Sequence, residues 1–234
     1  MFGNKKINVI LILGVVILKK IDINDWDRKK IYTWFKGFSN SCWSMTKELD
    51  VTNLVNYTKE SKTSFFINML YVVVKTLNSL ESMRMRLVDD EPVIYDNINP
   101  AYTVMTESGV FENLRHDFVD NYNQFYLLAK EKIEITKKQV KNDDIYNPKN
   151  HYNEYYITCV PWIEFSNISH PLPDDKSSQS VPRLCWGKYF KRNDKYIINF
   201  NVTVSHMFCD GYDVAQFYLK LQENIDSIRI ISEN

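Results

Sequence analysis

The sequence has no excess of charge of either sign. Lys and Arg together number 29, and so do Asp and Glu, so the formal net charge over 234 residues is zero. A chain that binds nucleic acid or an anionic membrane through its overall field needs a surplus of basic residues. We therefore expect neither a nucleic-acid nor a membrane partner.

Glycine, proline and cysteine are all scarce, at 6, 7 and 4 residues. Few Gly and Pro beside 14% aromatic residues exclude a disordered or repetitive chain and favour a folded core. The four cysteines form no C-x-x-C pair and no zinc-ligand spacing. We expect reduced thiols, no metal and a cytoplasmic location. A glycine-rich phosphate loop is also missing, which leaves extended surface contacts as the way to hold a coenzyme.

The longest apolar run covers residues 9–18 and has lysine pairs on both sides. It is too short to cross a bilayer as a helix. Its length suits the core of a signal peptide, but no small-residue cleavage site follows it. We expect residues 1–18 to be an edge strand or an N-terminal extension, and residues 19–234 to be a single domain.

Hydrophobic periodicity predicts helices and strands in irregular alternation. Helical spacing and capping residues indicate helices at 25–35, 50–60, 64–80, 114–141 and from 214 onward. Alternation and turn residues indicate strands at 41–49, within 83–106, and at 155–159, 184–191 and 195–206. Residues 142–153 and 170–183 are expected to be surface loops. This pattern favours the α+β class, with a mixed sheet flanked by helices.

The stretch with the clearest chemistry is 202–212. Strand parity places His206 at the end of an apolar face formed by Ile198, Phe200 and Val202. Partial burial there disfavours the charged imidazolium and leaves a neutral imidazole that can accept a proton. Asp210-Gly211 then makes the turn into a helix. Because a lone histidine on an apolar face is more often a packing residue, a catalytic interpretation depends on further motifs.

Further motifs are present, in order along the chain: Trp26-x-Arg28, Met83-Arg84-Met85, Tyr102-Thr103-Val104, Pro161-Trp162, Gly187-Lys188-Tyr189 and His206-x-x-x-Asp210-Gly211. Together they resemble the chloramphenicol acetyltransferase family over about residues 19–226. The resemblance implies a coenzyme A-dependent acyltransferase fold, and a homotrimer with active sites between subunits. It implies transfer of acetyl from acetyl-coenzyme A to a hydroxyl of chloramphenicol, without a metal, and hence a role in antibiotic resistance.

The resemblance also implies roles for individual residues. His206 matches the family's general base, which takes the proton of the acceptor hydroxyl. Asp210 matches an aspartate that pairs with the arginine matched by Arg28 and holds the histidine loop in place. Lys188 and Tyr189 match a strand beside the coenzyme, where a cation suits phosphate and an aromatic ring suits adenine. The positions that line the acceptor pocket are matched by Thr103, Phe35 and Phe111.

The sequence departs from the family pattern at several positions. In an alignment from Trp162, Asn167 stands where the family has the serine that donates to the tetrahedral oxyanion. An Asn amide can also donate, and loss of such a donor costs about 10²-fold or more in rate. Cys185 replaces a nearby threonine, and Phe35 replaces a pocket tyrosine. Ser205 replaces the first of two consecutive histidines, and His206 keeps the second.

Three alternatives therefore stay open. The first is an acetyltransferase for a different small hydroxylated acceptor. The second is the acyltransferase core of a 2-oxo acid dehydrogenase complex, which shares the His-x-x-x-Asp-Gly signature. Such cores usually follow a lipoyl domain and an Ala/Pro-rich linker, neither of which is found here. The third is a catalytically weakened relative that binds coenzyme A or only oligomerises, which Asn167 and Cys185 favour.

Overall fold

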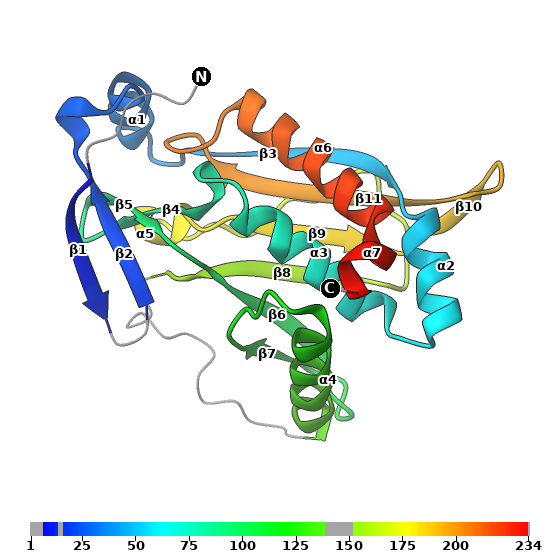
Figure 1. Ribbon diagram of the computed structural model, residues 1–234. Helices are drawn as coiled ribbons and strands as arrows, with labels where there is room; N and C mark the ends of the chain where they lie inside the picture. The colour runs from blue at the N-terminus through cyan, green and yellow to red at the C-terminus, as the bar shows by residue number, and fades with distance from the viewer. Residues whose placement is uncertain (1–6, 14–15, 139–151, 234) are drawn as a thin grey trace.

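Seven strands form the larger of two sheets, in a computed structural model that describes residues 7–13, 16–138 and 152–233 (Figure 1). The strand order is β10-β11-β9-β8-β6-β7, and β3 also pairs with β11. The pairs β6–β8 and β8–β9 are parallel and the others are antiparallel, so the sheet is mixed as predicted. Its strands are β3 (Cys42–Asp50), β6 (Asn99–Met105), β7 (Phe111–Arg115), β8 (Glu154–Val160), β9 (Arg183–Gly187), β10 (Phe190–Arg192) and β11 (Lys195–Ser205).

The smaller sheet is antiparallel, in the order β1-β2-β5-β4. It contains β1 (Ile7–Leu13), β2 (Val16–Ile21), β4 (Met85–Val88) and β5 (Glu91–Tyr95). The described residues of the apolar run at 9–18 lie in β1 and β2, and β1 is at the edge of this sheet. Because β2 continues past residue 18, this stretch is joined to the rest of the fold by sheet pairing with β5.

The helices that cover the larger sheet gather on one of its faces (Figure 1). They are α2 (Thr52–Ser61), α3 (Phe65–Asn78), α4 (Tyr122–Lys138), α6 (Gly211–Asp226) and α7 (Ile228–Glu233). Ten of the 14 residues of α3 are buried, because this helix is apolar nearly all round and lies between the sheet and α6. On α6, the predicted apolar positions Val214, Tyr218, Leu221 and Ile225 are all buried. The first cavity described below lies on the opposite face of the sheet, where none of these five helices packs.

Two predicted helices begin later than the sequence pattern indicated. Asp22 caps a separate 3-10 turn, η1 (Ile23–Asp25), so α1 covers only Lys29–Lys36. The predicted helix at 114–141 begins at Tyr122, because the preceding stretch pairs with β6 as strand β7. Residues 139–141, and most of the predicted loop at 142–153, lie outside the described residues.

The segments before and after β9 also differ from prediction. The predicted surface loop at 170–183 contains the short helix α5 (Lys176–Gln179). The last six residues of this segment, 178–183, are buried. The strand predicted at 184–191 is interrupted after Gly187, where the amide of Lys188 donates to the Ile163 carbonyl at 2.9 Å. A Cβ on Gly187 would lie 3.0 Å from that carbonyl and from the Phe165 ring, so the close approach requires glycine. The turn at Asn193-Asp194 is confirmed, since both residues have positive φ.

Candidate active site

His206 lies one residue beyond the end of β11, and its imidazole is half-buried among aromatic rings. The ring is stacked on Phe35 from α1, with centroids 4.0 Å apart and planes 7° apart, and it lies 5.6 Å from Trp43. The backbone amide of His206 donates to the Ser41 carbonyl at 2.8 Å, which fixes the start of the turn. Among the described residues, no group hydrogen-bonds to the buried Nδ1.

Asp210 begins α6 and holds the turn that follows His206. Its carboxylate accepts the amides of Tyr212 and Asp213, and the Asp213 side chain accepts the Asp210 amide in return, which completes a capping box. Arg28 Nη1 lies 3.0 Å from Asp210 Oδ2 and 3.2 Å from Asp213 Oδ2. Partial burial raises the pKa of Asp210, but the two amides and the Arg28 cation outweigh it, so this pKa lies below its usual value. Asp210 is therefore ionised at neutral pH and is committed to backbone amides and Arg28.

On the sheet face away from the helices, register brings polar side chains from separate strands into rows. The first, which we call the hydroxyl row, consists of Asn113, Thr103 and Thr158 on β7, β6 and β8. The Thr103 and Thr158 hydroxyls are 3.0 Å apart, so one donates to the other. Thr158 is not among the site residues predicted from the sequence. Its strand parity with Tyr156, close before Pro161-Trp162, was the available signal.

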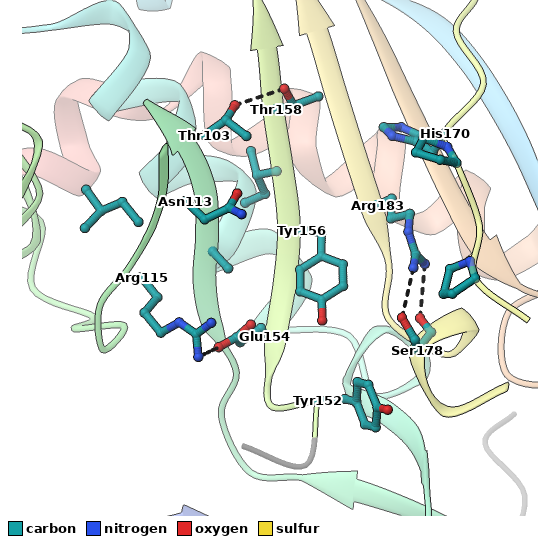
Figure 2. Close-up of a pocket in the computed structure, with 15 residues that line it drawn as sticks. Thr103, Asn113, Arg115, Tyr152, Glu154, Tyr156, Thr158, His170, Ser178 and Arg183 are labelled. Carbon is teal, nitrogen blue, oxygen red and sulfur yellow. Dashed lines mark hydrogen bonds and ion pairs between the residues drawn. The ribbon is translucent and has the colours of Figure 1, made fainter. Parts of the chain in front are cut away.

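The neighbouring row, which we call the charged row, consists of Arg115, Ala101, Tyr156 and Arg183. Both rows line a cavity of about 310 Å³, with Glu154 and His170 also in its wall. In Figure 2 the two threonines lie at one end of this cavity, and the Arg115–Glu154 pair and Arg183 lie farther along it. We call this space the charged cavity.

A second cavity of about 650 Å³, here the apolar cavity, shares Thr103 and Thr158 with the first. Phe111 and Trp162 line it, and both rings are largely exposed, at 61% and 63%. Two cations from α4, Lys130 and Lys137, line it as well. The two threonines therefore connect an apolar space to a charged one.

The remaining predicted site residues lie outside both cavities. Asn167 is exposed, and its Oδ1 accepts the Thr46 hydroxyl at 3.0 Å. Lys188 is exposed beyond the end of β9, and the ring of Tyr189 packs against Phe65 at 4.9 Å. His206 and Phe35 are also absent from the lining of either cavity. In the described part of a single chain, the histidine and the threonine hydroxyls are therefore in separate places.

The described residues contain no group of three or more His, Cys, Asp or Glu side chains placed to hold a metal ion. Within the same ranges, no helix is long and apolar enough to cross a membrane. All four cysteines are free thiols. Burial raises the pKa of Cys185 and of Cys159 to about 12, so both thiols are protonated at neutral pH.

The mixed sheet and its helical cover form the fold of the coenzyme A-dependent acyltransferases. Solved structures of that class share the fold. One is a chloramphenicol acetyltransferase with a TM-score of 0.80, 25% identity and coverage of 88% of this chain and 98% of that one. Another is a probable dihydrolipoamide acetyltransferase of Listeria monocytogenes, with a TM-score of 0.61 and 15% identity over 85% of this chain and 89% of that one. The second likeness concerns the fold alone.

The sequence comparisons point to one family among the proteins with this fold. The chloramphenicol acetyltransferase family profile matches residues 16–222. The chloramphenicol acetyltransferase of Proteus mirabilis is 27% identical over 216 residues, which is 92% of this chain and 96% of that protein. Chloramphenicol acetyltransferase 3 of Escherichia coli is 27% identical over 212 residues, or 89% and 97%. The chain belongs to the chloramphenicol acetyltransferase family, whose enzymes are acetyl-coenzyme A-dependent O-acetyltransferases.

Proposed function

We propose that this protein transfers acetyl from acetyl-coenzyme A to a hydroxyl of chloramphenicol in the cytoplasm, and so confers resistance to that antibiotic. The observation that carries the proposal is the family match over residues 16–222, in a chain that keeps His206 on the turn held by Asp210 and Arg28. The direct test is release of free thiol from acetyl-coenzyme A when chloramphenicol is added. Binding of coenzyme A without thiol release would contradict the proposal.

In the proposed reaction His206 takes the proton from the acceptor hydroxyl as the oxygen attacks the thioester carbonyl carbon. The new C–O bond gives a tetrahedral oxyanion, and a neighbouring donor stabilises it. Collapse of this intermediate breaks the C–S bond, and the departing thiolate takes the proton back from the imidazolium. No acyl-enzyme forms. Asp210 and Arg28 act by positioning the turn, since they form an ion pair and Asp210 also accepts the backbone amide of Tyr212.

The ligand contacts are proposed from the family match and the cavities. Lys188 and Tyr189 are assigned to the coenzyme, whose phosphates suit the exposed cation. Thr103 and Phe111 are assigned to the acceptor, because both line the apolar cavity. Phe35 is assigned to the acceptor side as well, through its stacking on His206. The coenzyme is a co-substrate, and the proposed chemistry needs no metal.

Two side chains are candidates for the hydrogen-bond donor to the oxyanion. Asn167 is the candidate from sequence alignment, but it is bonded to Thr46 and lies outside both cavities. Thr158 lines both cavities, so its hydroxyl is better placed. We expect Thr158→Val, which keeps the shape and removes the donor, to lower kcat about 10²- to 10³-fold, and Asn167→Ala to lower it less than about 10-fold. Steady-state kinetics of both variants decide between them, and a larger loss in Asn167→Ala would restore the alignment's assignment.

The separation of His206 from the cavities supports a homotrimer in which His206 of one subunit faces the cavities of the next. The expected result is complementation. His206→Ala and Thr158→Val are each weak alone, but co-refolded mixtures should recover activity at interfaces that combine one intact His206 with one intact Thr158. Thiol release from mixtures of varied ratio measures this effect. Activity that never exceeds the average of the separate variants would contradict an interfacial site, and sedimentation of each mixture is the control for assembly.

A further inference from the structure

The connection between α1 and β3 supports His206 at both of its ends. Phe35, near the end of α1, stacks on the His206 ring, and the Ser41 carbonyl, just before β3, accepts the His206 amide at 2.8 Å. The Ser41 hydroxyl is also 2.8 Å from the hydroxyl of Ser205, and both side chains are buried. Residues 37–41 belong to neither element, so side-chain contacts decide how firmly this connection is held.

Gln179 of α5 makes such contacts. Its side chain is 2% exposed and bonds to the connection in two places. Its Nε2 donates to the Ser39 carbonyl at 3.1 Å, and its Oε1 accepts the Ser41 amide at 3.5 Å. The same Nε2 donates to the Pro173 carbonyl at 2.9 Å. Both N–H groups and the oxygen of this amide are therefore used, and two of the three bonds hold residues 39–41.

The segment that carries Gln179 is itself anchored to both sheets. The Ser180 hydroxyl accepts the Leu87 amide of β4 at 3.0 Å. Arg183 of β9 donates to the Ser178 and Val181 carbonyls at 3.1 and 3.0 Å, on either side of that serine. Because these bonds fix the backbone around α5, its glutamine can hold the connection between α1 and β3 in a defined place.

From these contacts we propose that Gln179 is a positioning residue for acetyl transfer. By holding Ser39 and Ser41, it sets where the backbone of His206 lies, and hence where the imidazole meets the acceptor hydroxyl. Displacement of a reacting group by about 1 Å can cost about 10²-fold in rate. The inference rests on the proposed acetyl transfer, and it adds a residue that lies outside the six family motifs.

The first test compares two glutamines at opposite ends of β3. Gln222 of α6 accepts the Asp50 amide at 3.1 Å and donates to the Asp50 carbonyl at 2.8 Å and to Asp226 Oδ1 at 3.2 Å, so it also forms three bonds. Methionine at either position keeps the approximate length of the side chain and removes all three bonds.

With chloramphenicol as acceptor, we expect Gln179→Met to lower kcat about 10- to 100-fold while KM for acetyl-coenzyme A stays within about threefold. Gln222→Met should keep kcat within about threefold. Tm should fall in both variants, because each loses the same number of hydrogen bonds. Equal loss of kcat in the two variants, or an unchanged kcat in Gln179→Met, would overturn the inference.

The second test does not depend on turnover. The chain has four histidines, so ¹⁵N-histidine labelling gives few amide signals, and the one missing from His206→Gln belongs to His206. Hydrogen exchange of this amide reports its bond to the Ser41 carbonyl. We expect Gln179→Met to speed the exchange about 10-fold, the equivalent of about one lost hydrogen bond, and Gln222→Met to change it less than about twofold.

Exchange of the His206 amide in Gln179→Met as slow as in the wild type would overturn the inference. If Gln179→Met does not fold, Gln179→Asn takes its place in both tests, because it keeps the amide but is one methylene too short for all three bonds. Faster exchange in the variant, together with a wild type that releases no thiol with any acceptor, would instead overturn the proposed function. The part of the inference that concerns the position of His206 would then stand.

Discussion

Replacement of His206 by alanine will lower kcat for acetyl transfer on the order of 10³-fold or more and will leave the fold intact. Positioned proton transfer contributes about 10²- to 10⁴-fold to an enzymatic rate, and alanine removes it completely. The stability cost is small, because the imidazole is half-buried and its main described contact is the stack on Phe35. A stacked aromatic pair contributes about 0.5–1.5 kcal/mol.

The measurement is thiol release under saturating acetyl-coenzyme A, with Tm recorded for each variant. His206→Gln is the matched control, since glutamine keeps polar atoms of similar reach but is no base near neutral pH. It should lose as much activity as His206→Ala. The KM for acetyl-coenzyme A should stay within about threefold in both, because Lys188 and Tyr189 are untouched. Retention of a tenth of the wild-type kcat in either variant would exclude His206 as the general base.

Replacement of Arg86 by methionine will destabilise the protein by roughly 4 kcal/mol. Arg86 is fully buried, at 0% exposure, and donates to the carbonyls of Met83, Met85, Tyr152 and Glu154 at 2.7–3.0 Å. Methionine fills similar space but leaves these four acceptors without their donor, at a cost of about 1 kcal/mol or more each. The variant no longer has to bury a charge, which offsets part of the loss in stability. We therefore do not expect a loss much above 4 kcal/mol.

Arg84→Met is the matched control, two residues earlier in the same segment. Arg84 is only half-buried and donates to the carbonyls of Tyr95 and Asp96, so its loss should cost about 1 kcal/mol. Urea unfolding of both variants beside the wild type gives the comparison. An equal, small decrease in the free energy of unfolding of both variants would contradict the prediction. It would show that water donates to the four carbonyls in place of Arg86. A larger effect in Arg86→Met should also lower activity, because Arg86 fixes the first residues of β8, the strand that carries Tyr156 and Thr158.

The elements that depend on local pattern were predictable. The all-round apolar helix α3 and the strand–turn–helix unit from β11 to α6 follow from periodicity and from Asp210. The helical pattern from residue 114 wrongly includes the last two residues of β7, because a strand assignment depends on pairing with β6, and pairing is a property of two segments. The last residues of the 170–183 segment were read as exposed, because their burial depends on bonds from Arg183 to Ser178 and Val181.

The same distinction holds for the site. The family motifs located His206, Asp210 and Arg28, and the structure places the last two in contact. The charged row could not be predicted, because its members come from four strands whose order in the sheet, β7-β6-β8-β9, differs from their order in the sequence. Only the sheet register places Arg115 and Arg183 along one line. The hydroxyl pair of Thr103 and Thr158 depends on the same register.

The contacts around Arg28 close a ring through two distant parts of the chain. Arg28 immediately precedes α1, α1 carries Phe35, and Phe35 stacks on His206. Four residues later Asp210 caps α6 and binds Arg28 again. We expect the starts of α1 and α6 to unfold together, because loss of either one removes contacts that stabilise the other. The N-terminal helix, 182 residues away from Asp210 in the sequence, is thus part of the same local folding equilibrium as the histidine turn, and any factor that frays α1 also reduces the fraction of molecules with His206 in place.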